Sequence, residues 1–164
     1  VSPTRFVTDS SLEGLARRLR QLGYDVAVLR GARHEELFAA AAADGRTVLT
    51  LSARRPRRFC AVPVALVPRA DEAAAVRMIA AGHEATSAPF TRCSACNTTL
   101  RARHPMEASG EVPGRVLRRA SRLHSCPACG RWYWDGSHVA RLTLWLETAL
   151  GHKLERGGDA PTGS

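Results

Sequence analysis

Two Cys-x-x-Cys motifs, at residues 93–96 and 126–129, are the part of this sequence whose spacing best predicts chemistry. Each motif closes a tight turn that directs two thiolates toward one ion, and two such turns complete a tetrahedral site. Asn97 and Gly130 follow the motifs, and these residue types readily adopt the left-handed backbone that such a turn needs at its exit. The pattern predicts a zinc ribbon over residues 91–135, with a structural Zn²⁺ that has no position left for a substrate. The four expected ligands are Cys93, Cys96, Cys126 and Cys129.

Two other interpretations of the cysteines are weaker. Two disulfides would suit a secreted protein, but the chain does not begin with the pattern of a signal peptide, and the fifth cysteine, Cys60, has no partner. A thioredoxin-like redox motif explains one Cys-x-x-Cys pair but not two. Cys60 borders an apolar run, so we expect it to be a buried thiol.

The charge of the chain favours a polyanionic partner. Its formal net charge is +9, and all its basic residues except Lys153 are arginines. Four thiolates around one Zn²⁺ remove two positive charges and leave the protein basic, which favours RNA as a partner. No apolar stretch reaches the length of a membrane span, so we expect no membrane partner and a cytoplasmic location.

The basic residues are concentrated in the ribbon. Residues 91–135 hold eight arginines against three acidic residues. These arginines are either a solvated surface or a surface that follows RNA phosphates, and their position on a rigid metal-held module favours the second interpretation. His138 either caps the helix expected at 139–149 or contacts a phosphate. The aromatic run 132–134 either stacks on bases or, as is more common, packs in the ribbon. The candidate RNA contacts are Arg17, Arg20, Arg115, Arg118, Arg119, Arg122 and His138.

The first 90 residues alternate between short apolar runs and amphipathic segments. Strands are expected at 5–8, 26–29, 47–50 and 62–67, and helices at 10–22, 34–43 and 71–81. Ser10 and Glu13 form a capping-box pattern at the start of the first helix. This alternation predicts an α/β fold with a parallel sheet and helices on both faces. We expect three parts: an α/β domain (1–90), the ribbon with a C-terminal helix (91–150), and a disordered tail (151–164).

In a parallel sheet, ligands bind beyond the carboxyl ends of the strands. Asp9 ends the first expected strand, Ser52 follows the third, and residues 34–36 open the helix after the second. These three places are expected to converge on one crevice. Asp9 considered alone is equally typical of a helix N-cap.

Several segments, in order, resemble one known family. They are residues 6–20, 22–25, 36–37, 45–50, 92–97, 126–131 and 133–138. Together they resemble the Mut-seven C-terminal RNase domain, a family of PIN-like nucleases. The resemblance implies a PIN-like Rossmannoid fold with an appended zinc ribbon. It also implies an RNA-directed phosphodiesterase that uses Mg²⁺ or Mn²⁺ held by carboxylates.

The resemblance implies three acidic positions, of which only the first is retained as an acid. Asp9 matches that first position. His34 stands at the second, although Glu35 and Glu36 adjoin it, and Ser52 stands at the third. A hydroxyl cannot replace a carboxylate as an anionic ligand of Mg²⁺, so a metal site built on Asp9, Glu35 and Glu36 is expected to be weak.

Three functions are therefore compatible with the sequence. The first is a ribonuclease with a depleted acidic site and weak binding of Mg²⁺ or Mn²⁺. The second is a non-catalytic RNA-binding protein that keeps the fold, the ribbon and the basic surface. The third is a zinc-stabilised module that binds another protein. The missing acids favour the second function over the first.

Overall fold

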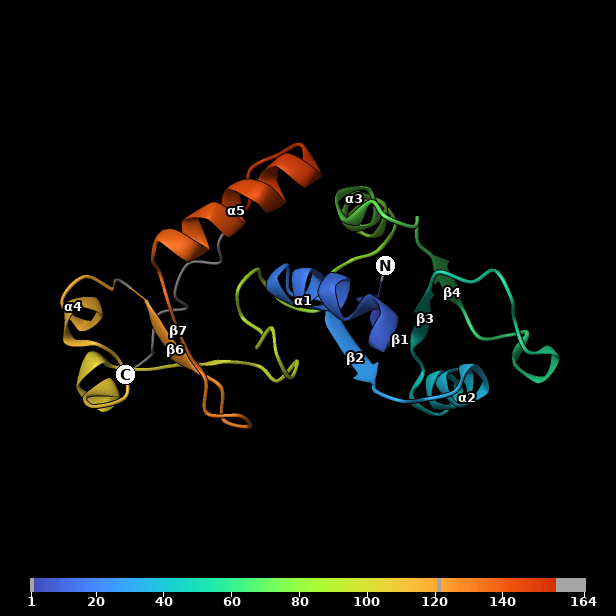
Figure 1. Cartoon of the computed structure of the whole chain (residues 1–164), viewed down its shortest axis with the longest axis horizontal. Helices are drawn as coiled ribbons and strands as arrows, with labels where there is room; N and C mark the ends of the chain where they lie inside the picture. Colours follow the sequence, from blue (N-terminus) through green and yellow to red (C-terminus); the bar gives the residue numbers. More distant parts are fainter. Residues whose placement is uncertain (1, 121, 156–164) are drawn as a thin grey trace.

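The computed structural model describes residues 2–120 and 122–155, and its larger sheet is parallel throughout (Figure 1). The strands lie in the order β2-β1-β3-β4, with β1 pairing in parallel with both β2 and β3. The mixed α/β fold expected from the sequence is thus confirmed. The strands are β1 (Arg5–Asp9), β2 (Asp25–Leu29), β3 (Thr47–Thr50) and β4 (Val64–Leu66).

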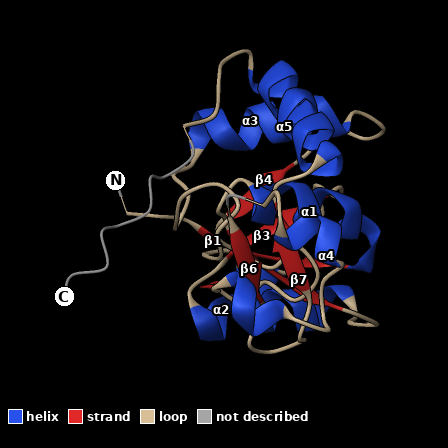
Figure 2. Ribbon diagram, turned by 90° about the vertical axis from the view of Figure 1, so that its left-hand side faces the viewer, coloured by secondary structure: helices blue, strands red, loops and turns tan. Residues whose placement is uncertain are grey.

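Helices cover both faces of this sheet, because successive strand residues point to opposite sides. Phe6 belongs to the core beneath α1, α3 and α5, whereas Val7 belongs to the core beneath α2. Figure 2 shows α3 and α5 next to each other on one side of the sheet and α2 on the other. The helices are α1 (Glu13–Gln21), α2 (His34–Asp44), α3 (Glu72–Gly82) and α5 (Ser137–Leu150).

The entry to α1 differs from the expected capping box. A short 3-10 turn, η1 (Ser10–Leu12), precedes the helix, and its N-cap is Asp9, not Ser10. Asp9 Oδ1 accepts hydrogen bonds from the Ser11 backbone N–H at 2.8 Å and from Ser11 Oγ at 2.5 Å. Because β1 runs in extended conformation up to Asp9, this residue is the last one free to cap the turn.

The C-terminal helix completes the core of the N-terminal layer. Leu142, Leu146 and Ala149 of α5 are buried with residues of α1 and α3. The Arg18 guanidinium lies 4.5 Å from the centre of the Trp145 ring, and its Nε donates to Glu72 at 2.8 Å. The boundary expected at residue 90 stays a prediction, but α5 packs with the elements that precede it. Of the tail expected from 151, residues 156–164 lie outside the described residues.

The ribbon forms a second, smaller sheet between α3 and α5 in the sequence. Its three strands are antiparallel in the order β5-β6-β7. Ala108, Val112 and Leu123 form its core, with Trp132 and Trp134 packed against them, as the packing interpretation of the aromatic run expected. Its elements are β5 (Arg101–Ala102), η3 (Pro105–Ala108), α4 (Gly114–Leu117), β6 (Leu123–Ser125) and β7 (Trp132–Trp134). No helix in the described parts of the chain is long and apolar enough to span a membrane.

Candidate functional site

The four cysteines of the two motifs come together in one cluster. Their sulfur atoms all lie within 4.8 Å of one another. Cys93 Sγ is 3.6 Å from Cys129 Sγ, and Cys96 Sγ is 3.4 Å from Cys126 Sγ. Sulfurs at the corners of a tetrahedron around Zn²⁺ would lie about 3.8 Å apart, given a Zn–S bond of about 2.3 Å. The cluster therefore fits a metal ion such as zinc, with all four ligands supplied by the chain.

The two cysteine turns, residues 93–97 and 126–130, have the same backbone geometry. In the first, the Asn97 N–H donates to the Cys93 carbonyl at 2.9 Å, and in the second the Gly130 N–H donates to the Cys126 carbonyl at 2.9 Å. Asn97 and Gly130 both have φ = 73°. The left-handed exits expected at these two residues are thus confirmed.

Tyr133 is a partner of the cluster that the sequence analysis missed. Its hydroxyl lies 3.0 Å from Cys93 Sγ. Burial and the hydrogen bond to Cys93 raise the pKa of Tyr133 to about 12, so the phenol keeps its proton at neutral pH and would be the donor to a metal-bound Cys93 thiolate. Such outer hydrogen bonds orient metal ligands. The alternation of side chains along β7 turns Tyr133 away from its two tryptophan neighbours, but that alternation does not by itself identify a cysteine as its partner.

The cysteines differ in how easily they lose a proton. Burial of Cys96 acts to raise its pKa, but hydrogen bonds with Thr98 and with the neighbouring thiols outweigh burial and lower it to about 6. The Arg131 backbone lowers the pKa of Cys129, but burial and the other three cysteines raise it to about 12. A bound cation would remove this competition for protons, because metal ligation favours every thiolate.

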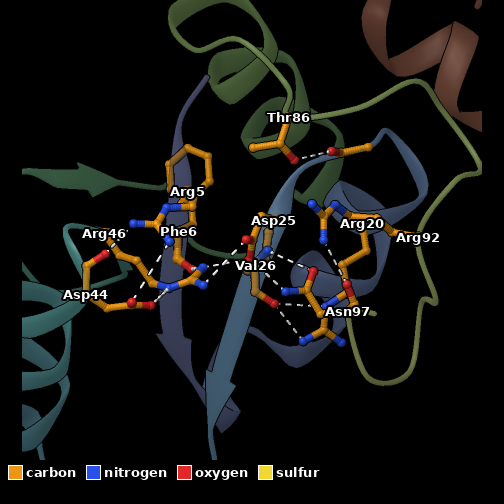
Figure 3. Close-up of polar contacts among 11 residues, drawn as sticks. Arg5, Phe6, Arg20, Asp25, Val26, Asp44, Arg46, Thr86, Arg92 and Asn97 are labelled. Carbon is orange, nitrogen blue, oxygen red and sulfur yellow. Dashed lines mark hydrogen bonds and ion pairs between the residues drawn. The ribbon is translucent and has the colours of Figure 1, made fainter. Parts of the chain in front are cut away.

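A polar seam joins the first cysteine turn to the parallel sheet (Figure 3). Asn97 Oδ1 accepts from the Val26 backbone N–H at 3.1 Å, and Asn97 Nδ2 donates to Asp25 Oδ1 at 2.7 Å. Arg46 Nη1 donates to the same Asp25 oxygen at 2.6 Å and to the Phe6 carbonyl at 3.1 Å. The seam therefore links the metal-binding turn to β1 and β2 through one carboxylate.

Arg20 belongs to this seam and not to the surface. Its side chain is buried, with 3% of the residue exposed. Its guanidinium donates to the carbonyls of Val26, at 2.7 and 2.9 Å, and of Ser94 and Ala95, at 2.9 and 3.0 Å. The expectation that Arg20 contacts RNA is corrected accordingly, because its donors are used inside the protein. Arg17 is exposed and pairs with Glu13 at 3.2 Å.

The carboxylates expected at the carboxyl end of the sheet are each bound to a neighbour. Asp9 accepts from Ser11, Glu36 pairs with Arg33 at 2.7 Å, and Glu35 pairs with Arg58 at 3.0 Å. Among the described residues, the four cysteines are the one group of three or more metal-ligating side chains close enough to hold an ion. The described residues do not include Asp9, Glu35 and Glu36 in one group of this kind, and their role as metal ligands stays a prediction.

His34 and Ser52, which stand where the family resemblance implies acids, both bond to the backbone of Arg54. The Arg54 N–H donates to Ser52 Oγ at 3.2 Å, and His34 Nε2 donates to the Arg54 carbonyl at 2.8 Å. Neither residue supplies the anionic oxygen ligand that Mg²⁺ or Mn²⁺ prefers. Cys60, expected to be buried, is exposed instead, because it ends a surface loop whose apolar anchor is the neighbouring Phe59.

The ribbon presents the predicted arginines around α4. Arg115, Arg118 and Arg119 are exposed, and Arg122 is half-buried. His138 is exposed in the first turn of α5, where it lines a cleft of about 730 Å³ with Arg131 and residues 132–134 of β7. The structure thus places a cationic surface and aromatic rings on the ribbon, and a histidine at the adjoining start of α5. Whether they contact RNA stays a prediction.

Comparison with known families gives a match that covers most of the chain. The model of the Mut7-C RNAse domain matches residues 4–146, nearly the whole chain. The chain belongs to the Mut7-C RNAse domain family. Searches of the curated proteins and of the solved structures returned no match. Membership of the Mut7-C family supports a nuclease-like, RNA-related role, and it agrees with the resemblance described from the sequence.

Proposed function

We propose that this Mut7-C family protein binds RNA and that its phosphodiester-cleaving activity is slow or absent. The observation that supports this most directly is the arrangement of the carboxylates at the carboxyl end of the parallel sheet. Asp9, Glu35 and Glu36 are each engaged by protein groups and do not form a cluster. Efficient metal-dependent cleavage needs carboxylates gathered around the cation, and this chain offers isolated ones.

RNA binding is supported by the composition of the ribbon surface. The exposed arginines around α4 supply planar guanidinium groups that bind phosphate through two parallel hydrogen bonds. The adjacent cleft adds the rings of Trp132 and Trp134, on which bases can stack, and His138 as a further donor. A strand lying across the ribbon would thus meet both kinds of contact that single-stranded RNA requires.

We further propose that the ion of the Cys₄ cluster is zinc and that its role is structural. Four thiolates in tetrahedral spacing match the preferences of Zn²⁺, and no ligand position is left open for a substrate. The thiols must stay reduced to bind it, which suits a cytoplasmic location. Binding the ion fixes both cysteine turns and therefore the orientation of the arginine surface.

Family membership favours a second candidate function, metal-dependent cleavage of RNA at Asp9. Incubation of labelled RNA with Mn²⁺ and the wild type, Asp9→Asn or Ser52→Asp distinguishes the two. Asparagine keeps the oxygen that caps η1 but removes the charge, so Asp9→Asn abolishes any genuine cleavage while leaving the fold intact. Ser52→Asp supplies a carboxylate at one of the missing positions and is expected to raise affinity for Mn²⁺.

We expect wild-type cleavage to be near background and RNA binding to weaken steeply with salt. Replacing the four arginines at 115, 118, 119 and 122 by Ala should reduce the slope of log K against log salt by about two to three, since each phosphate contact contributes about 0.7. Rapid cleavage that Asp9→Asn abolishes would replace this proposal with the nuclease. Absence of RNA binding would leave the protein-interaction module as the better interpretation.

A further inference from the structure

The carboxyl edge of the sheet is rich in arginine. Residues 52–60, which we call the arginine loop, follow β3 and contain four arginines and no acidic residue. The loop includes the short turn η2 (Arg57–Phe59) and lies beside the start of α2. All four of its arginines are exposed: Arg54, Arg55, Arg57 and Arg58.

Hydrogen bonds and packing hold this loop in place. Ser52 and His34 bond to the N–H and the carbonyl of Arg54, and the Arg55 guanidinium donates to the Cys60 carbonyl at 2.8 Å. The ring of Phe59 packs against the buried core beneath α2. The two residues at the missing acidic positions thus anchor the loop that carries the positive charges. A positioned set of cations loses less entropy on binding an anion than a flexible loop would.

The loop arginines are available to a ligand. Within the described residues, no ion pair engages the guanidinium of Arg54, Arg55 or Arg57. Arg58 pairs with Glu35, but both side chains are more than half exposed, at 66% and 57%. Surface pairs of this kind contribute little to stability, so a phosphate can compete for the guanidinium. The local field at this edge attracts anions and repels divalent cations.

We propose that the arginine loop is a second RNA-binding surface, which binds the phosphodiester backbone directly and without a divalent metal. This inference rests on the proposed RNA-binding function and extends it to the edge where a metal would otherwise be expected. Figure 1 places the loop and α4 at opposite ends of the long axis of the molecule, so the two arginine surfaces can be tested separately. One RNA strand that reaches both would be held at its two ends.

The test measures binding of labelled single-stranded oligouridine to the zinc-loaded protein in the presence and absence of Mg²⁺. The variant is Arg54→Gln with Arg57→Gln, because neither guanidinium makes a hydrogen bond or an ion pair with the parts of the chain that the structure describes. The control removes the same charge elsewhere, by Arg141→Gln on α5 and Lys153→Gln after it, both of which are exposed. Binding is followed over a series of salt concentrations, and thermal unfolding checks that both variants stay folded.

We expect the loop variant to reduce the salt slope by about 1.4, since two phosphate contacts contribute about 0.7 each, and the control to change it little. Wild-type affinity should not rise when Mg²⁺ is added. If the loop variant binds as the wild type does while the variant with Ala at 115, 118, 119 and 122 loses slope, the inference fails and the proposed function stands. If the loop and control variants lose slope equally, general charge and not this loop explains the binding, which also overturns the inference. If the wild type does not bind the RNA at all, both the inference and the proposed function fail.

Discussion

The two cysteine turns share a backbone but differ in what surrounds them. At the exit of the first turn, the Asn97 side chain bonds to Asp25 and to the backbone of β2, and two carbonyls of the turn accept from the buried Arg20. At the exit of the second turn, Gly130 has no side chain, and a Cβ built there would meet no atom within 4 Å. Residues 127–131 are exposed.

This difference separates two tasks that a Cys₄ site performs. The first turn attaches the ion to the parallel sheet through directed hydrogen bonds, while the second turn attaches the ribbon to the ion. The ion and the contact between Tyr133 and Cys93 then link the second turn to the first. Disturbing the two turns should therefore have unequal effects, even though their ligands and dihedral angles match.

The largest effect is expected from Cys126→Ser, which removes a ligand supplied by the second turn. Structural zinc contributes about 10 to 16 kcal/mol of apparent binding free energy in small peptides, more than the whole stability of many domains. We expect loss of zinc and fast amide exchange in β5, β6 and β7, with slow exchange retained in β1 and β3. Elemental analysis and hydrogen exchange measure these outcomes.

Cys60→Ser is the matched control for this prediction. Cys60 is exposed and lies outside the cluster, so the variant should keep one zinc per chain and the exchange pattern of the wild type. Full zinc content in Cys126→Ser, or a disulfide between the ribbon cysteines, would contradict the assignment of the ligands.

The next effect concerns Asp25, which connects the first turn to the sheet. Burial acts to raise the pKa of Asp25, but hydrogen bonds from Arg46 and Asn97 outweigh it and lower that pKa below its ordinary value. The charged carboxylate is therefore favoured in the folded state. Its contribution is fully present above the unfolded pKa of about 3.9 and is lost as the pH falls through the lower folded pKa. At neutral pH, Asp25→Asn should lower the free energy of unfolding by about 2 to 4 kcal/mol, because Arg46 loses a largely buried charged partner.

Denaturant unfolding of the wild type and Asp25→Asn, from neutral pH down to pH about 3, measures this contribution. Zinc also dissociates as the thiolates are protonated, so the difference between the two proteins isolates the part due to Asp25. Asp44→Asn is the control, since Asp44 also pairs with Arg46 but is exposed. If the two variants lose equal stability, or if their difference from the wild type does not depend on pH, the seam does not act through Asp25.

The parts of this molecule that the sequence predicted are those governed by local rules. Strand β3 has the expected bounds, and α2 extends the expected helix by one residue, because alternating apolar runs and a glycine stop specify them. The metal cluster could also be predicted, since its ligands lie in two short motifs. The residue type at the exit of each turn indicates the left-handed backbone conformation there.

The roles of single polar residues were not predictable, because they depend on contacts between distant segments. Arg20 resembles any other arginine of α1, and only its position against residues 94–95, more than seventy positions later, makes it a buried donor. Asp9 satisfies the requirements of both a metal ligand and an N-cap. Ser52 and His34 already indicate from the sequence that carboxylates are missing near Asp9. That both side chains instead hold the arginine loop depends on packing, which the sequence does not specify.

The smallest and most discriminating effect comes from exchanging the residues at the two turn exits. Asn97→Gly keeps the left-handed conformation but removes the hydrogen bonds to Asp25 and Val26, so it should cost about 1 to 3 kcal/mol. Gly130→Asn places a side chain in open space at the same φ, which asparagine tolerates, so it should cost less than about 1 kcal/mol. Neither change touches a sulfur ligand, and both proteins should bind one zinc. Denaturant unfolding of the two zinc-loaded variants measures the difference.

Equal losses of stability in the two variants would mean that both turns depend only on the ion, and the proposed attachment of the first turn to the sheet would be wrong. A larger loss in Asn97→Gly, with slower exchange retained in the ribbon than in β2, would locate that attachment at the start of β2.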